Sequence, residues 1–514
     1  QQRLVKRIVR EMNLDDSKWP PRQAQWFINK QKDEGLRAEH LDPGGDPYQR
    51  QMIAIYREYE AACQRAGSVD FAELLLRAHE LWRDRADILQ HYRERFGAIL
   101  VDEFQDTNSI QYAWLRLLAG NEDKLFVVGD DDQSIYGWRG ARVENIQDFQ
   151  GHYPNAGVVR LEQNYRSTGN ILQAANAVIA NNPTRLGKQL WTEDGEGEPI
   201  RVYGAYNEVD EARFVIDRIR SAIEHGGRRS EMAILYRTTA QSRLFEESLL
   251  QAGIPYRVYG GLRFFERAEI KDALAYLRLV SNRHDDPSFE RAVNQPPRGI
   301  GPRTLDAVRA HGRDFGCSLW QAAGDLLRGG AMTARAANAL RRFRDLIEEI
   351  DANSAGEDLP GRAAFVVEAS HLREHFEKSR DGKGQDRIEN LEELVNACRQ
   401  FELPEEEGES GLSEMDAFLA HAALEAGDTQ ADEYEDCVQL MTLLSAKGLE
   451  CPLVFIGGVE EGLFPHSMSA EDPERLEEER RLCYVGMTRA MSQLYLTHAE
   501  SRRLHGSENF PIPS

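Results

Sequence analysis

Three short apolar runs in this chain each end in a dense polar cluster. Residues 99–101, Ile-Leu-Val, lead into Asp102 and Glu103, residues 127–128 lead into the polar run 129–134, and a third run ends at 161, before Asn-Tyr-Arg-Ser at 164–167. Carboxylates, a carboxamide and an arginine at strand ends are typical of α/β folds that hydrolyse nucleotides. Because the three clusters are close in the sequence, we expect them to serve one site.

The remaining hydrophobic pattern predicts two kinds of structure. Apolar positions three and four apart indicate helices in residues 1–96 and again from about 267 to 430. From residue 97, short buried strands alternate with helices, which favours a mostly parallel sheet. Further strands are predicted at 200–206, 232–236, 256–259, 438–443, 453–457 and 494–497. The fold class is therefore predicted to be α/β, with largely helical segments inserted.

Length and composition set broad limits on this picture. The 514 residues are too many for one core, and roughly three to four domains are expected. No apolar run is long enough to predict a membrane span. The start, Gln1–Arg7, lacks an initiator methionine and a signal-peptide core, and we expect a cut inside a helix. The six cysteines form no Cys-x-x-Cys pair, which favours reduced thiols in a cytosolic protein.

The net charge of −23 argues against nucleic acid as a partner when it is taken alone. The charge is uneven, however. Glu402 to Asp436 contains thirteen acidic residues and no lysine or arginine, which is typical of a solvated surface or hinge. A local basic groove elsewhere in the chain remains compatible with this total.

The Asp102-Glu103 pair suggests metal and water chemistry. A carboxylate at a strand end suits Mg²⁺, which prefers oxygen ligands and keeps part of its water shell. The adjacent glutamate suits the activation of an attacking water. An acidic cap at the start of a helix explains the same two residues, and the pair alone does not separate the alternatives.

The run Gly129–Gly140 is more specific. Gln133 offers a neutral donor and acceptor for a terminal phosphate or its water. Tyr136, Trp138 and Arg139 combine two aromatic rings and a guanidinium beside glycines, which suits stacking on unpaired bases. The alternative is a glycine-rich turn whose aromatic rings fill a core, and the polar residues before them argue against it.

Three further clusters carry weaker signals. Tyr165 and Arg166 are predicted to open a helix, where the arginine can approach a phosphate. Residues 441–450, which contain Thr442, Lys447, Gly448 and Glu450, suit phosphate contacts. Residues 477–490 form a predicted charged helix whose charges are mostly surface pairs, with Arg489 apart from them.

Residues 298–304, Arg-Gly-Ile-Gly-Pro-Arg-Thr, lie between two predicted helical segments. Tight glycines expose backbone N–H groups that can hold a DNA phosphate. A plain turn between helices is the alternative, and these residues alone do not decide between the two.

Taken in this order, the clusters resemble the superfamily 1 DNA helicases of the UvrD/PcrA/Rep type. The resemblance covers essentially the whole chain, including residues 19–24, Trp-Pro-Pro-Arg-Gln-Ala, and residues 70–81 in the first region. Six motifs in the same order make chance agreement negligible. The resemblance implies RecA-like motor domains, the first of them incomplete, ATP and Mg²⁺ as cofactors, and DNA as the partner.

The resemblance also implies roles for individual residues in hydrolysis and DNA binding. For the nucleotide, Asp102 would bind Mg²⁺, Glu103 would activate water, Gln133 would couple the γ-phosphate to DNA, Tyr165 would stack on adenine, Arg166 and Arg489 would bind the γ-phosphate, and Gly448 and Glu450 would lie at the nucleotide, with Glu450 near the ribose. For DNA, Tyr136, Trp138 and Arg139 would contact single strands, Arg237 and Thr442 would face the backbone, Gly299, Ile300, Gly301 and Thr304 would grip the duplex, and His505 would stack where strands separate.

The family's subdomains imply a division of this chain into five parts. Residues 1–96 match the helical subdomain 1B, 97–162 the second half of 1A, 163–259 the first part of 2A, 260–432 the helical subdomain 2B, and 433–514 the second part of 2A.

Four departures from the family pattern affect this expectation. The chain holds no Gly-rich loop ending in Lys-Ser/Thr, so the lysine and hydroxyl that would hold the phosphates and Mg²⁺ are missing. Leu444 stands where the family usually has a histidine that contacts DNA, and Cys451 replaces a common phenylalanine. His505 occupies the place of an aromatic residue at the tip of the strand-separating hairpin, which predicts weakened rather than lost separation.

By the resemblance, the expected function is ATP-driven, 3′-to-5′ translocation on single-stranded DNA that unwinds duplexes in repair and replication. ATP would sit between the two α/β domains. The expected partners are single strands and junctions with duplex, together with repair proteins, and the expected state is a monomer or a DNA-induced dimer in the bacterial cytoplasm, associated with the nucleoid. The main alternative is a DNA-binding fragment without catalysis, and a helicase–nuclease ranks last, because no carboxylate–lysine nuclease cluster is evident.

Overall fold

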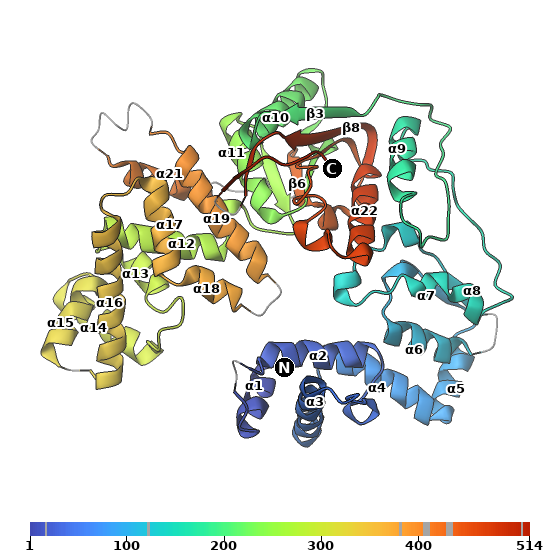
Figure 1. The fold of residues 1–514 in the computed structure, drawn as a ribbon, viewed down its shortest axis with the longest axis horizontal. Helices are drawn as coiled ribbons and strands as arrows, with labels where there is room; N and C mark the ends of the chain where they lie inside the picture. Colours follow the sequence, from blue (N-terminus) through green and yellow to red (C-terminus); the bar gives the residue numbers. More distant parts are fainter. Residues whose placement is uncertain are drawn as a thin grey trace. The chain divides into compact units, whose positions relative to one another are not determined.

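The computed structural model describes residues 1–15, 18–120, 124–330, 332–379, 383–403, 412–427, 435–504 and 507–514 (Figure 1). The chain divides into two compact units. Unit 1 comprises Gln1–Tyr165, Leu172–Gly195 and Glu471–Val485, and unit 2 comprises Arg166–Ile171, Glu196–Ala470 and Gly486–Ser514. The five-part division expected from the sequence remains a prediction.

Unit 1 begins with the helical region that the sequence pattern predicts. Short polar residues and prolines define where its helices begin: Asp46 caps α3 ahead of Pro47, and the Asp70 carboxylate accepts the N–H of Glu73 at 2.7 Å to cap α4. Apolar faces of α1, α2 and α3 then share one core. The helices are α1 (Gln2–Glu11), α2 (Pro21–Asp33), α3 (Pro47–Ala66), α4 (Phe71–Asp84) and α5 (Ala86–Arg95).

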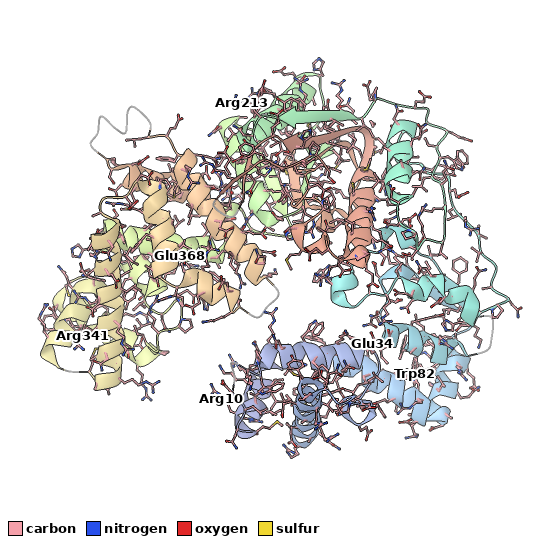
Figure 2. The ribbon with its side chains drawn as sticks, in the orientation of Figure 1. Arg10, Glu34, Trp82, Arg213, Arg341 and Glu368 are labelled. Carbon is pink, nitrogen blue, oxygen red and sulfur yellow. The ribbon has the colours of Figure 1, made fainter. Side chains whose placement is uncertain are left out.

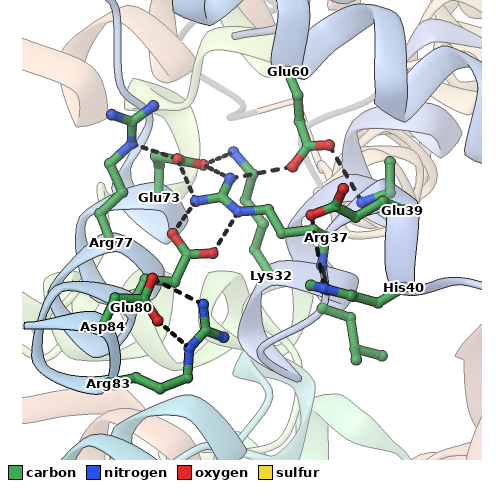
Figure 3. A network of polar contacts seen from close by, with 12 residues as sticks. Lys32, Arg37, Glu39, His40, Glu60, Glu73, Arg77, Glu80, Arg83 and Asp84 are labelled. Carbon is green, nitrogen blue, oxygen red and sulfur yellow. Dashed lines mark hydrogen bonds and ion pairs between the residues drawn. The ribbon is translucent and has the colours of Figure 1, made fainter.

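A network of buried charges joins three of these helices (Figure 3). Glu73 on α4 accepts hydrogen bonds from Arg37 at 3.0 Å and Arg77 at 2.6 Å, and it pairs with the Lys32 ammonium of α2 at 2.7 Å. Arg37 also bonds Glu60 of α3 at 3.1 Å. Burial alone would raise the pKa of Glu73, but the hydrogen bonds from Arg37, Lys32 and Arg77 lower it to about 2.

The rest of unit 1 is built on two parallel strands. β1 (Ile99–Val101) pairs with β2 (Leu125–Val127), with Val101 opposite Val127. Trp82 and Trp114 stack beside this pair with ring centroids 4.5 Å apart. The helices that follow β1 are α6 (Ser109–Ala119), α7 (Glu144–Gln147) and α8 (Phe149–His152). α9 (Gly169–Ile179) belongs to unit 1 from Leu172 onward. The short 3₁₀ helices of unit 1 are η1 (Ala38–His40), η2 (Phe104–Asp106), η3 (Asp131–Gln133) and η4 (Gly137–Arg139).

The third predicted strand is wrong. Among the residues that the structure describes, those from Gly157 to Glu162 belong to no strand, and Gln163 makes only an isolated bridge to Trp191. The apolar side chains of Val159 and Leu161 are exposed. An apolar run becomes a strand only where a neighbouring strand can pair with it, and here the pairing does not extend beyond one bridge. The helix after it is also displaced: α9 begins at Gly169, so Tyr165 and Arg166 precede it.

Unit 2 contains a six-stranded sheet with the order β3-β8-β7-β4-β6-β5, and every pair in it is parallel. This confirms the predicted α/β class. Its central strand β4 is buried along its whole length, as expected for a continuous apolar run covered on both faces. The strands are β3 (Arg201–Ala205), β4 (Met232–Tyr236), β5 (Tyr256–Tyr259), β6 (Val438–Thr442), β7 (Cys451–Ile456) and β8 (Ala490–Ala499), and the helices α10 (Glu208–Glu224) and α11 (Ser242–Gln251) pack on the sheet.

A buried ion cluster fixes the end of this sheet. Arg502 donates to both carboxylate oxygens of Glu460 at 3.0 Å and also pairs with Glu211 of α10. Glu211 accepts the hydroxyl of Thr497 on β8 at 2.6 Å. The cluster therefore ties β8 and α10 to β9 (Arg502–Leu504), which pairs antiparallel with β10 (Ser507–Asn509).

The predicted helical insert forms a second body within unit 2, with its own apolar core (yellow-green to orange in Figure 1). Arg243 of α11 joins the two bodies, because its guanidinium donates to Glu393 of α19 at 2.6 Å. The helices are α12 (Ala268–Ser281), α13 (Asp286–Ala292), α14 (Pro302–Phe315), α15 (Leu319–Gly329), α16 (Ala334–Ser354), α17 (Leu359–Ala369), α18 (Leu372–Glu377), α19 (Gly384–Gln400) and α21 (Glu414–Gly427).

The remaining sequence predictions have mixed outcomes. All six cysteines are free thiols. No helix in the described ranges is long and apolar enough to cross a membrane.

Charged side chains lie on the exposed faces of the helices, for example Arg213 on α10, Arg341 on α16 and Glu368 on α17 (Figure 2). Within the acidic block 402–436, residues 404–411 and 428–434 lie outside the described residues.

The charged helix is α22 (Pro473–Met487). Arg481 bonds Glu477 at 3.1 Å, which agrees with the predicted pairing of residues four apart. Glu479 and Arg481 are buried, so the predicted surface position is wrong for these two residues. A local charge pattern shows which residues are four apart, but it does not show which face of the helix is covered.

Glu73→Gln is predicted to destabilise unit 1, because it removes the buried carboxylate that Lys32, Arg37 and Arg77 share, although Lys32 keeps Asp70 and Arg37 keeps Glu60 and Glu80. The expected loss is about 1–3 kcal/mol of unfolding free energy at neutral pH. The pKa of Glu73 is lowered from 4.5 to about 2, so its contribution is complete above pH 4.5 and is lost as the pH falls toward 2. Urea unfolding across this pH range should therefore show a smaller pH dependence in the variant.

Glu39→Gln serves as the matched control, because the Glu39 side chain is 79% exposed and lies 3.7 Å from the His40 ring nitrogen. It should change stability by less than about 0.5 kcal/mol. Equal effects of the two substitutions would contradict a special role of the buried network.

Candidate nucleotide and DNA site

The ends of β1 and β2 bring two of the predicted clusters together in unit 1. The N–H of Val128 donates to the carbonyl of Val101 at 2.8 Å, and the N–H of Phe104 donates back to Val128 at 2.9 Å. Because the strands are parallel, Asp102 and Asp130 leave the same edge of the sheet. This is the arrangement that the sequence predicted for the first two clusters.

Asp102 and Glu103 form the exposed tip of this edge. The Asp102 carboxylate accepts the N–H of Glu103 at 2.9 Å. Glu103 has a φ of 49°, a left-handed conformation that non-glycine residues rarely adopt and that costs about 1–3 kcal/mol. The turn aims its carboxylate at Gln105, whose amide nitrogen donates to it at 2.6 Å. An exposed carboxylate at a strand end suits the binding of a hydrated Mg²⁺ at Asp102.

The three aspartates 130–132 have a different environment. Their carboxylate oxygens lie within 4.8 Å of one another, a spacing compatible with a metal ion. Instead, two cations occupy the carboxylates: Arg185 donates to both oxygens of Asp132 at 2.9 and 2.6 Å, and Lys188 pairs with Asp132 at 2.9 Å and with Asp130. Burial would raise the pKa of Asp132, but Arg185 and Lys188 lower it. Asp131 accepts the N–H of Leu186 at 2.7 Å, so all three carboxylates have protein partners.

Gln133 and the aromatic residues follow this network. The Gln133 amide donates to Asp130 at 2.7 Å. In the next turn, the Arg139 guanidinium lies 4.6 Å from the centre of the Trp138 ring and 5.4 Å from that of Tyr136. Trp138 is 62% exposed. The alternative of aromatic rings that fill a core therefore fails for Trp138, and an exposed ring beside a cation suits the stacking of an unpaired base.

Unit 2 brings three other predicted residues together. Arg166 donates to the Glu450 carboxylate at 2.9 Å. Arg489 donates to the carbonyl of Leu449 at 3.2 Å, one residue before Glu450. The Ser167 hydroxyl donates to the carbonyl of Ala490 at 2.6 Å, and this contact fixes the segment that carries Arg166 to the start of β8. Arg489 is only 2% exposed. Its guanidinium would therefore have to leave the carbonyl of Leu449 to bind a phosphate directly.

The parallel sheet of unit 2 also aligns the predicted backbone contacts. Tyr236 at the end of β4 lies opposite Thr442 at the end of β6, so Arg237 and Thr442 share one edge. The Thr442 hydroxyl accepts the N–H of Ser445 at 3.3 Å and so begins the turn η8 (Leu443–Ala446). Gly448 follows with a φ of +88°. A sheet edge with hydroxyls and a tight glycine suits contacts to phosphates.

The turn 298–304 is shaped by Asn294 and packs on the core of the helical insert. The Asn294 carboxamide oxygen accepts the N–H groups of Arg298 at 2.7 Å and Ile300 at 3.3 Å. Ile300 is buried in the core, so its side chain faces inward rather than toward a ligand. Gly301 precedes α14, on which Thr304 lies in the first turn. Contact with DNA would have to use backbone groups and Thr304, and it remains a prediction.

The remaining predicted residues are placed as follows. Tyr165 is 79% exposed. Leu444 lies half-buried in η8, and Cys451 is fully buried at the start of β7, where burial raises the pKa of its thiol to about 11. His505 lies outside the described residues, so its role at the hairpin tip remains a prediction.

Three contributors to the site carried no assigned role in the sequence. Gln105 lies inside the first motif, yet its side chain is buried and its amide nitrogen donates to Glu103. Arg185 and Lys188 lie in a polar loop after α9, far in sequence from the aspartates that they pair with. A surplus of acidic residues at 130–132 was the available signal, because buried carboxylates require cations.

Comparisons with known proteins agree with these features. Residues 1–154 match the model of the UvrD/REP helicase N-terminal domain, and residues 159–501 match that of the UvrD-like helicase C-terminal domain. The chain is 60% identical over 514 residues to DNA helicase II of Escherichia coli, covering 100% of this chain and 71% of that protein. It is 53% identical to DNA helicase II of Haemophilus influenzae, covering 100% and 70%, and 42% identical to the ATP-dependent DNA helicase PcrA of Bacillus subtilis, covering 98% and 69%.

Proposed function

This chain belongs to the family of UvrD-like helicases, and on that basis we propose that it works as an ATP-dependent DNA helicase that moves 3′ to 5′ along single strands and opens duplexes in repair and replication. The observation that carries the proposal is local to unit 1. The end of β1 presents Asp102 and Glu103, and the loop after the neighbouring strand presents the exposed Trp138 beside Arg139. Groups suited to nucleotide hydrolysis and to base stacking therefore follow adjacent strands.

The proposed chemistry assigns a separate task to each residue. Asp102 would hold Mg²⁺, which supplies charge neutralisation for the phosphates. Glu103 would take the proton of the attacking water, and Gln133 would respond to the terminal phosphate. In unit 2, Arg166 and the buried Arg489 would balance charge on the γ-phosphate, and Glu450 would approach the ribose beside Gly448. Tyr165, the last residue of the first segment of unit 1, would stack on adenine.

The proposed DNA contacts combine stacking with backbone binding. Tyr136, Trp138 and Arg139 would stack on unpaired bases, and Arg237 and Thr442 would hold phosphates. The turn 299–301 with Thr304 would contact duplex DNA at a junction, and His505 would lie at the point of separation. The net charge of −23 predicts weak non-specific binding, so affinity would come from these local groups.

The second candidate function is DNA binding without catalysis. The 514 residues contain no Gly-rich loop ending in Lys-Ser/Thr. The lysine and hydroxyl side chains that such a loop supplies to the β- and γ-phosphates and to Mg²⁺ are therefore missing from these residues. On their own, these residues are expected to bind ATP weakly while keeping the stacking surface for DNA.

ATP hydrolysis with and without single-stranded DNA separates the two candidates. We expect a chain extended upstream through a Gly-x-Gly-Lys-Thr loop to hydrolyse ATP with stimulation by DNA, whereas the 514-residue chain stays near background. In the extended chain, Glu103→Gln should lower kcat by about 10²- to 10⁴-fold, because the water loses its base. Strong, equal hydrolysis by both chains would refute the need for the loop, and no stimulation in the extended chain would refute the helicase proposal.

Trp138→Ala is predicted to weaken the binding of this chain to a fluorescent oligothymidine. Loss of one stacked base corresponds to about 1–3 kcal/mol. Trp26→Ala is a closely matched control, because Trp26 is 63% exposed and has the Lys30 ammonium 5.2 Å from its ring centre. Unchanged binding by Trp138→Ala, or equal weakening by both variants in fluorescence anisotropy, would contradict the assigned stacking surface.

A further inference from the structure

Gln105 is a fully buried carboxamide that lies between the ends of β1 and β2. Its amide nitrogen donates to the Glu103 carboxylate at 2.6 Å, and its amide oxygen accepts the N–H of Asp130 at 2.9 Å. Both ends of the side chain are therefore engaged, one by the first motif and one by the second. A buried amide with two defined partners is held in a single orientation.

The contacts continue from Asp130 to Gln133. Asp130 is the cap of η3, its carboxylate accepts the N–H of Asp132 at 3.0 Å, and it accepts the Gln133 amide at 2.7 Å. Lys188 pairs with the same carboxylate. A continuous path of hydrogen bonds thus runs from Glu103 through Gln105 and Asp130 to Gln133.

The neighbouring backbone is shaped to admit this side chain. A Cβ atom at Gly129 would lie 2.6 Å from the Gln105 amide oxygen and 2.9 Å from Ile146 Cδ1. The strand end can therefore approach Gln105 only because residue 129 has no side chain. The close approach places the Asp130 N–H against the amide, and the path depends on it.

We propose that Gln105 is a positioning residue that holds the Glu103 carboxylate and transmits displacement of the Asp130–Gln133 loop to it. This role rests on the proposed function, in which Glu103 activates water and Gln133 responds to the terminal phosphate. Gln105 itself touches no reacting atom. Because its two ends are bonded to different loops, movement of Asp130 shifts the amide and so redirects Glu103. Base stacking after η3 and water activation after β1 are then mechanically linked.

Two substitutions at Gln105 separate its two contacts. Gln105→Glu keeps an oxygen that can accept the Asp130 N–H, but it places a second carboxylate against Glu103 and so repels it. Gln105→Met keeps the volume of the side chain and removes both hydrogen bonds. The control is Gln111→Glu, because Gln111 accepts the N–H of Asn108 at 2.9 Å through its oxygen, which a glutamate also supplies.

Hydrogen exchange on the 514-residue chain tests the contact without nucleotide. The peptide that contains Asp130 should exchange faster in Gln105→Met and at the parental rate in Gln105→Glu and Gln111→Glu. Unchanged exchange in Gln105→Met would overturn the proposal, because the amide of Asp130 would then not depend on Gln105.

Kinetics on the upstream-extended chain test the role. Both Gln105 variants should lower kcat for DNA-stimulated ATP hydrolysis by about 10- to 100-fold, the range for a hydrogen bond to a charged group. The KM for ATP should stay within about two-fold of the parent.

The affinity of the extended chain for single-stranded DNA gives a second readout, measured with and without a non-hydrolysable ATP analogue. In Gln105→Met, the ratio of these two affinities should fall toward one. Parental kcat and parental affinity ratios in an active enzyme would overturn the proposal. An extended parent that does not hydrolyse ATP would refute the proposed function and this role together, and the exchange result would still report the contact separately.

Discussion

Parallel strand pairing is the constraint on which both candidate sites depend. Two neighbouring parallel strands must end at the same edge, so polar residues that follow them are brought together although they are distant in sequence. In unit 1, this places Asp102 and Glu103 beside Asp130. In unit 2, it places Arg237 beside Thr442, with more than two hundred residues between them that include the helical insert. The apolar strands therefore determine the position of the chemistry without taking part in it.

Buried charge is the second organising feature. Asp132 with Arg185 and Lys188, Glu73 with Lys32 and Arg37, and Glu460 with Arg502 each join elements that lie far apart in the chain. Such pairs add little net stability compared with apolar packing, but a missing partner leaves an uncompensated charge and is strongly unfavourable. We infer that they specify which elements pack together.

The sequence predicted those features that depend on local pattern. β4 has the predicted bounds, because a continuous apolar run bounded by polar residues allows few other structures. β5 also has the predicted bounds, although Arg257 lies within it. The run ending at Leu161 has the same local pattern, yet it forms no strand, since a strand also needs a partner along its edge. The pairing of one strand with another depends on the whole fold, so a short stretch of sequence cannot predict it.

The candidate site divides in the same way. Asp102 and Glu103 are exposed at the end of a predicted strand, and Trp138 is exposed in the glycine-rich run that follows the next predicted strand. Other features of the site depend on contacts between distant segments. These are the buried amide of Gln105, the ion pairs of Lys188, and the burial of Ile300 and Arg489. A residue type and its spacing indicate possible chemistry, but the direction of the side chain follows from packing.

Strand displacement on DNA of defined polarity tests the central claim most directly. The upstream-extended chain would be given ATP, Mg²⁺ and a duplex with a single-stranded tail on either the 3′ or the 5′ end, and release of the labelled strand would be followed by fluorescence. The account predicts that the 3′-tailed duplex is unwound, that the 5′-tailed duplex is not, and that unwinding stops without ATP. Unwinding of the 5′-tailed duplex alone, or release of neither strand by a chain that hydrolyses ATP, would contradict it.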